Sequence, residues 1–205
     1  MLPQNLADTT PTHIQNLIDS EVAESLTLEY KQALPTQQSE DKREFLYDIA
    51  GMANSGGGDF IYGIEDRRGE DKKATGVAGS IVGMWLPNPQ AEIDRLSNLI
   101  RDGIAPRLSG IVMQPVICSS GVVLVVRVPR SWNRPHMVTI DKANKFYGRV
   151  STGKYLMSVD EVRRAFSEQG ECGMQSIAGD LRERRSQNNI EDLSYVRAMS
   201  RCFSM

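Results

Sequence analysis

The stretch Glu24-Ser-Leu-Thr-Leu-Glu29-Tyr-Lys31 decides the fold, together with Asn54-Ser-Gly-Gly-Gly58-Asp-Phe-Ile-Tyr-Gly-Ile-Glu65-Asp66 further along the chain. Apolar and polar side chains alternate over residues 26–31, which predicts a half-buried strand. Residues 59–65 are apolar on both faces, which predicts a central strand. If the two strands lie side by side, they bring several carboxylates and one amine to the same place.

The segments around this pair predict further helices and strands. Ser39 is a good N-cap for a helix that the glycines after Asn54 end. Apolar spacing predicts helices over residues 11–20 and 89–102 and a helix from Ser158, and strand pairs over residues 110–118 with 122–128 and 136–141 with 145–150. This order predicts an α+β fold, a mixed, largely antiparallel sheet packed with helices.

Size and composition are those of a globular protein. The 205 residues are 40% apolar and 24% charged, and three widely spaced cysteines form no zinc or disulfide pattern. With no apolar run near the ~20 residues of a membrane span and no signal peptide at the start, we expect a cytoplasmic protein with no membrane contact. We expect a helical N-terminal extension over residues 1–19, a domain over 20–169 and a helical appendage over 170–205.

Charge is distributed unevenly along the chain. Residues 1–66 hold twelve acidic and three basic side chains, whereas residues 130–165 hold eight basic and three acidic ones. Such a division allows cation binding in one segment and phosphate binding in the other. Solvated surface is the alternative for both.

Acids and a lysine on the first strand form the candidate catalytic group. Glu29 and Lys31 are two residues apart, so they project from the same face of a strand. Carboxylates that hold a divalent metal beside a lysine are typical of metal-dependent nucleases. Glu24 can join them only from a bend before the strand, and alternation admits either Asp66 or Glu65, of which Asp66 is preferred. The alternative is a set of surface acids with Lys31 as an ion-pair partner.

The glycine-rich and aromatic segments offer weaker signals. Gly56–Gly58 follow a helix, so they predict a helix stop and a close approach rather than a phosphate loop. Residues 148–154 nearly match a nucleotide-binding loop, but Tyr155 replaces its hydroxyl residue. We expect instead a basic loop that binds nucleic-acid phosphates through Arg149 and Lys154, with Tyr147 or Tyr155 for stacking. Trp85 and Trp132 are expected to pack under loops.

Together these motifs resemble the Schlafen-type AlbA domain family. The resemblance is carried by the two opening stretches, by Gly76-Val77, Arg134-Pro135-His136 and Phe146-Tyr147-Gly-Arg149-Val, and by Met157-Ser158 leading into Glu161. It covers about residues 20–168 and implies a mixed-sheet domain that binds DNA or RNA.

In Schlafen proteins a related core cleaves transfer or ribosomal RNA with three acids and a divalent metal. The resemblance places those acids at Glu24, Glu29 and Asp66 with Lys31 beside them, and implies Mg²⁺ or Mn²⁺ and no organic cofactor. Arg134, Tyr147, Arg149 and Lys154 would contact nucleic acid. A homodimer could supply the second lobe of that core. The alternatives are a non-catalytic DNA-binding or partner-binding regulator, for example in transcription or defence, and a nucleotide-binding protein.

Overall fold

A computed structural model describes residues 2–69, 74–142, 144–151 and 153–168 of the chain. Residues 1–162 form one compact unit, and residues 163–205 fall outside it. The capping box predicted at Ser158 is present. The Glu161 N–H donates to the Ser158 hydroxyl, and the Ser158 N–H and hydroxyl both donate to the Glu161 carboxylate. The expected appendage over 170–205 lies outside the described residues.

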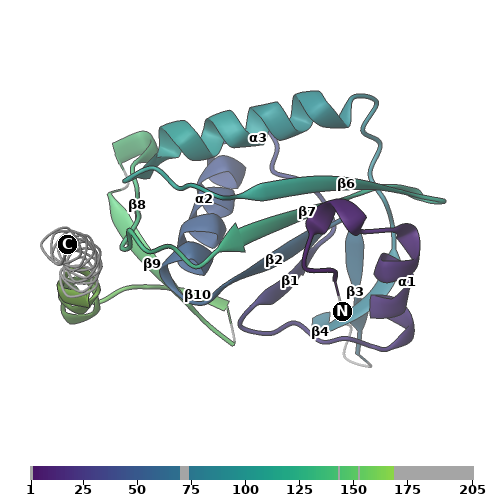
Figure 1. The fold of residues 1–205 in the computed structure, drawn as a ribbon, viewed down its shortest axis with the longest axis horizontal. Coiled ribbons are helices and arrows are strands. Elements are labelled where there is room, and N and C mark those ends of the chain that lie inside the picture. Colours follow the sequence, from purple (N-terminus) through teal and green to yellow (C-terminus); the bar gives the residue numbers. More distant parts are fainter. Residues whose placement is uncertain (1, 70–73, 143, 152, 169–205) are drawn as a thin grey trace, which may run out of the picture. The chain divides into compact units, whose positions relative to one another are not determined.

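A four-stranded sheet forms the centre of the unit, in the order β1-β2-β7-β6 (Figure 1). The strands are β1 (Leu28–Lys31), β2 (Gly57–Tyr62), β7 (Gly121–Pro129) and β6 (Val112–Cys118). β1 pairs with β2 in parallel, and the other pairs are antiparallel. The two opening strands are therefore neighbours, which meets the condition under which their carboxylates and amine come together. Pro115 lies on the edge strand, where its missing N–H is tolerated.

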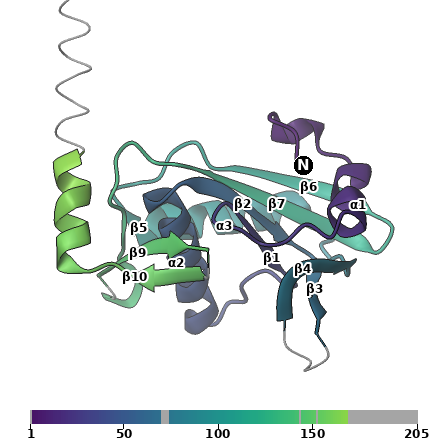
Figure 2. The same cartoon turned by 90° about the horizontal axis from the view of Figure 1, so that it is seen from below.

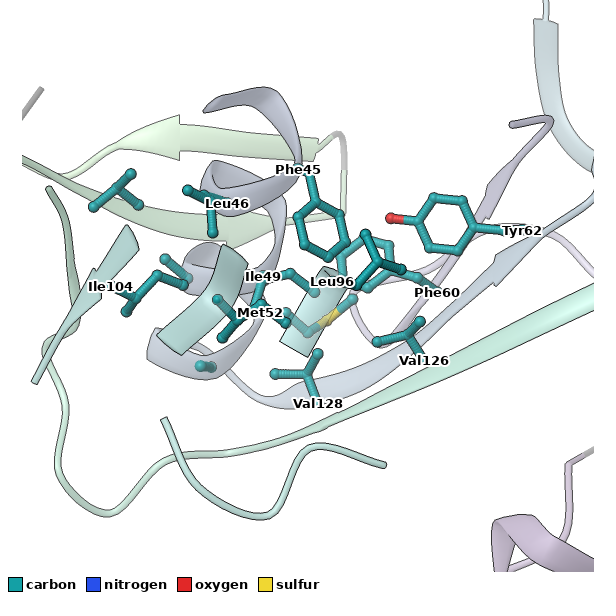
Figure 3. Packing of buried hydrophobic residues seen from close by; sticks show 14 of the residues in the cluster. Phe45, Leu46, Ile49, Met52, Phe60, Tyr62, Leu96, Ile104, Val126 and Val128 are labelled. Atoms are coloured by element: carbon teal, nitrogen blue, oxygen red, sulfur yellow. The ribbon is translucent and has the colours of Figure 1, made fainter. Parts of the chain in front are cut away.

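Two helices cover one face of this sheet. They are α2 (Ser39–Asn54) and α3 (Pro89–Gly103), close to their predicted bounds. Figure 3 shows apolar side chains of α2 pointing towards Phe60 and Tyr62 of β2 and Val126 and Val128 of β7. Successive strand residues alternate between the two faces, so Ile61 points to the other side. Phe60 is fully buried, and truncation of such a side chain typically costs ~3–5 kcal/mol.

The opposite face is covered by the N-terminal helix and a hairpin. The helix α1 (Pro11–Asp19) follows a 3₁₀ turn η1 (Leu6–Asp8), and the hairpin consists of β3 (Ile64–Arg68) and β4 (Ala74–Ile81), seen beside α1 in Figure 2. Helix α1 contacts β4 and β6, and Ile14 and Leu17 are buried in this second core. β4 was not predicted, because its glycines and small residues give no clear alternation.

A second sheet, in the order β10-β9-β8-β5, packs on α2. Its strands are β5 (Ile104–Ala105), β8 (Met137–Val138), β9 (Lys145–Val150) and β10 (Gly153–Leu156), with a 3₁₀ turn η2 (Ile140–Lys142) before β9. The expectation of a basic loop over residues 148–155 is wrong, since β9 and β10 form an antiparallel hairpin there. The predicted α+β class is confirmed, and no helix in the described residues is long and apolar enough to cross a membrane.

Candidate charged site and nucleic-acid interface

The glycine turn between α2 and β2 lets three segments meet. Gly57 has a φ of +72°, and a Cβ there would clash with the backbone of Arg130. A side chain at Gly58 would clash with the backbone of Thr27, which precedes β1. The glycines therefore act as a helix stop and a close-approach point, as predicted. Asn54, just before them, fixes the neighbouring segment: its side chain accepts from the His136 N–H (2.7 Å) and donates to the carbonyls of His136 (3.0 Å) and Tyr147 (2.8 Å).

Six alternating charges run from α2 across β10 and β1 to β9, and we call them the charge chain. Its members are Glu44, Lys154, Asp48, Lys31, Glu29 and Arg149. Glu29 and Lys31 share a face as predicted, with Lys31 Nζ 2.5 Å from Glu29 Oε1. Asp48 lies between two lysines, 3.2 Å from Lys31 Nζ and 2.6 Å from Lys154 Nζ.

Glu44 and Asp48 were missed from the sequence. Asp48 is 3% exposed on a helix whose neighbouring positions form the apolar core. A buried carboxylate is rare unless it is paired, so an acid within the apolar stripe of α2 was the available signal. Its spacing of four residues from Glu44 places both acids on one side of the helix.

Arg149 closes the charge chain inside the protein. Its residue is 6% exposed, and its guanidinium donates to Glu29, to the Leu26 carbonyl at 3.0 Å and to the Ser25 carbonyl at 3.2 Å. Lys154 is likewise bound by two acids of α2. Both side chains are thus directed towards protein carboxylates in this conformation.

The pKa values of the chain follow from burial and pairing. Burial alone would lower the pKa of Lys31, but Asp48 and Glu29 raise it above its usual range. Burial would raise the pKa of Glu29, but Lys31 and Arg149 lower it instead. Burial raises the pKa of Asp48 despite its two lysines, with the Glu29 charge adding to the effect. Lys31 therefore stays charged at neutral pH.

Glu24 and Asp66 form a second group, which we call the acidic corner. The bend predicted before β1 is present: a turn at residues 25–28 brings Glu24 Oε1 within 2.8 Å of the Tyr30 N–H. Burial raises the pKa of Glu24, and the nearby charges of Asp66 and Glu29 raise it further. Burial also raises the pKa of Asp66, helped by Glu29 and Glu65. These carboxylates repel one another.

A bulge in β3 decides between the two adjacent acids. The register of β3 with β4 shifts on both sides of Asp66, so Glu65 and Asp66 do not alternate as in a regular strand. Glu65 Oε1 lies 3.6 Å from Arg68 Nη2. Asp66 interacts electrostatically with Lys31 and Glu29, and its Oδ1 is buried without a hydrogen-bond partner among the residues that the structure describes. Asp66 is thus the acid that faces β1.

The fit of a divalent metal to these acids is incomplete. Over the described residues, no group of three or more His, Cys, Asp or Glu side chains is placed to hold a metal ion. Both oxygens of Glu29 are engaged, one by Lys31 and one by Arg149. Glu24, Glu29 and Asp66 therefore do not form a three-carboxylate centre in this arrangement, and Glu24 and Asp66 remain as a pair of interacting carboxylates.

A different surface presents basic and aromatic side chains, and we call it the arginine–tryptophan loops. It comprises residues 105–110 and 129–136, which contain Arg107, Arg130 and Arg134 and no acid. Arg107 and Arg130 are exposed, and Arg134 is half-buried. Trp132 is 82% exposed, so the expectation that it packs under a loop is wrong. Trp85, at 89% exposed, also does not pack under a loop.

Buried His136 ties the two loops together. Its Nδ1 lies 2.7 Å from the Pro106 carbonyl, so Nδ1 must carry the proton and donate. Nε2 then accepts from the Ser131 hydroxyl at 2.6 Å. Burial lowers the pKa of His136, although the bond to Pro106 opposes the shift, so the ring is neutral at physiological pH.

The ring of Tyr147 packs against the ring of Tyr47. It stacks on Tyr47 of α2 with ring centroids 4.2 Å apart and an interplanar angle of 28°. Stacking of this kind ties β9 to α2. One face of the Tyr147 ring is therefore already covered by protein.

Comparison with known proteins identifies the family. The profile described as Schlafen, AlbA_2 matches residues 24–158, so the chain belongs to this family. No curated protein matches the chain. The solution structure of the N-terminal domain of a protein related to the ATP-dependent DNA helicase RecG, from Nitrosomonas europaea, has a TM-score of 0.50 at 18% identity, covering 69% of this chain and 88% of that one. This likeness shows the fold.

A second similar structure is the DIP2311 protein from Corynebacterium diphtheriae. It has a TM-score of 0.44 at 19% identity and covers 71% of this chain. The chain spans only 26% of that protein's length.

Proposed function

We propose that this Schlafen, AlbA_2 protein binds nucleic acid through the arginine–tryptophan loops. The observation that carries the proposal is the placement of Arg107 and Arg130 on an exposed surface segment without acids. Guanidinium groups bind phosphate oxygens in a fork geometry, and exposed cations gain affinity by releasing counterions from the nucleic acid. The similar Nitrosomonas europaea domain belongs to a protein related to a DNA helicase, which is compatible with such a role.

The charge chain indicates which basic residues are available to bind phosphate and which are already paired with acids of the protein. Arg149 and Lys154 each contact acids of the protein, so a phosphate would have to compete with carboxylates that are already in place. Arg130, by contrast, borders a cavity of about 920 Å³ that the glycine turn also lines. We therefore assign the phosphate contacts to Arg107 and Arg130, with Arg134 beside them.

Salt-dependent binding tests this proposal. Fluorescence anisotropy with a labelled single-stranded oligonucleotide should show log Kd rising linearly with log salt concentration. The double variant Arg107→Ala/Arg130→Ala should lower that slope by about 0.7 for each phosphate contact removed. The matched control is Arg67→Ala/Arg68→Ala on the β3–β4 hairpin, which should leave the slope unchanged. An unchanged slope in the loop variant would contradict the assignment.

We propose metal-dependent RNA cleavage as a second function, on the strength of the acidic corner. The charge of Asp66 adds to the burial that raises the pKa of Glu24, and Asp66 Oδ1 lacks a hydrogen-bond partner among the described residues. A divalent cation such as Mg²⁺ or Mn²⁺ would relieve that repulsion. Glu29 would first have to leave Lys31 or Arg149 to become a third ligand.

A thermal shift and a cleavage assay test the second function separately. Mn²⁺ should raise the melting temperature of the natural protein and leave that of Asp66→Asn unchanged. Structured RNA should be cut with Mn²⁺ and left intact with chelator or in the Glu24→Gln and Asp66→Asn variants. The control variant is Glu65→Gln, which should retain both responses. Absence of a metal-dependent shift together with intact RNA would exclude this function and leave nucleic-acid binding untouched.

A further inference from the structure

We propose that the indole of Trp132 is a stacking platform for an unpaired base, so that the ligand is a single strand or a strand with an unpaired end. This inference rests on the proposed nucleic-acid binding and adds to it the class of ligand. Trp132 is 82% exposed and lies between Arg130 and Arg134 in the chain. Every base offers a flat face to such a ring, whereas a duplex hides those faces inside its stack.

The backbone on both sides of Trp132 is anchored. The Ser131 N–H donates to the Ala53 carbonyl at 3.0 Å, and the Ser131 hydroxyl donates to His136. The Asn133 N–H in turn donates to Ser131 Oγ at 3.1 Å. His136 is fully buried and is bonded to Asn54 as well. The loop is thus fixed before a ligand arrives, which reduces the entropy that binding would otherwise lose.

Charge distinguishes this tryptophan from the other exposed one. Trp85 lies near the opposite end of β7, since Met84 pairs with Val122 there. Residues 82–88 carry no charged side chain, and Val82 and Ile117 add apolar surface. Trp132 instead lies two residues after Arg130, an exposed arginine that can hold a phosphate beside a stacked base. Trp85 is therefore a matched control of the same size and similar exposure.

The test compares one sequence as a single strand and as a blunt duplex. Affinities of the natural protein, Trp132→Ala, Trp132→Phe and Trp85→Ala are measured by fluorescence anisotropy, with melting temperatures to confirm folding. Trp132→Ala should weaken single-strand binding about 5-fold or more and duplex binding less than about 2-fold. Trp132→Phe should retain part of the single-strand affinity, and Trp85→Ala should change neither.

The outcomes separate the two proposals. Equal weakening for both ligands, or no effect of Trp132→Ala while the natural protein binds, overturns the stacking inference alone. No binding of either ligand by the natural protein overturns the nucleic-acid function as well.

Discussion

The charge chain and the arginine–tryptophan loops use the same kinds of residue for opposite purposes. Arg149 and Lys154 are paired with Glu29, Asp48 and Glu44 inside the protein. Arg107, Arg130 and Trp132 are exposed on segments without acids. The difference teaches that the acids of α2 and β1, which arrive from distant parts of the sequence, determine whether a basic residue is structural or available to a ligand.

Removing Arg149 should cause the largest loss of stability, because it breaks the charge chain. Arg149→Ala leaves the Glu29 carboxylate, which is only 13% exposed, beside a single lysine. The loss of one partner of a buried ion pair costs about 3–5 kcal/mol. The melting temperature should fall by about 10 °C. Arg107→Ala, the exposed counterpart, should change the free energy of unfolding by less than about 0.5 kcal/mol. Similar losses in both variants would remove the distinction between the two regions.

Removing the Ser131 hydroxyl tests whether the anchoring of the arginine–tryptophan loops matters for stability and binding. Ser131→Ala leaves His136 Nε2 and the Asn133 N–H without their shared partner, which should cost about 1–2 kcal/mol in chemical denaturation. Single-strand affinity should fall a few-fold, because the loop is no longer fixed. The control is Ser109→Ala on the companion loop, expected to lie within about 0.5 kcal/mol of the natural protein. An affinity unchanged in Ser131→Ala would show that anchoring is irrelevant to binding.

Neutralising Asp66 in the acidic corner should have the smallest effect on stability, and it should stabilise the protein rather than destabilise it. The pKa of Asp66 is raised in the folded state, so its charge lowers stability above the unfolded pKa, and that penalty disappears as the pH falls through the folded value. Asp66→Asn should therefore raise the melting temperature at neutral pH by about 1–3 °C. At about pH 4 and below, near the ordinary pKa of Asp, the gain should vanish.

A decrease in melting temperature at neutral pH would contradict this prediction for Asp66. The matched change Glu65→Gln concerns the adjacent acid, which lies near Arg68, and it should bring no stabilisation.

The sequence was sufficient for the local features of this fold. Alternation in β1 placed Glu29 and Lys31 on one face, the glycines after Asn54 ended α2, and the spacing of Glu24 required the bend that is present. These features depend on neighbours within a few residues. The parallel pairing of β1 with β2 did not follow from their patterns, which left open whether the two strands are neighbours.

Features that depend on distant contacts did not follow from the sequence. Arg149 and Lys154 lie in a basic segment, and nothing local shows that α2 and β1 supply their partners. The exposure of Trp132 depends on Asn54 and Ala53, which hold the segment around Ser131 and His136 from the end of a helix far back in the chain. A large aromatic residue in a proline-containing loop more often packs inward, so its outward position is visible only in three dimensions.

Photo-crosslinking to a single-stranded oligonucleotide tests the central comparison most directly. After ultraviolet irradiation and protease digestion, mass spectrometry identifies the peptides that carry nucleotide. We predict adducts on the segment containing Trp132 and none on the β9–β10 hairpin that contains Tyr147 and Lys154. Adducts on that hairpin, with Trp132 unmodified, would contradict the assignment of the ligand to the arginine–tryptophan loops.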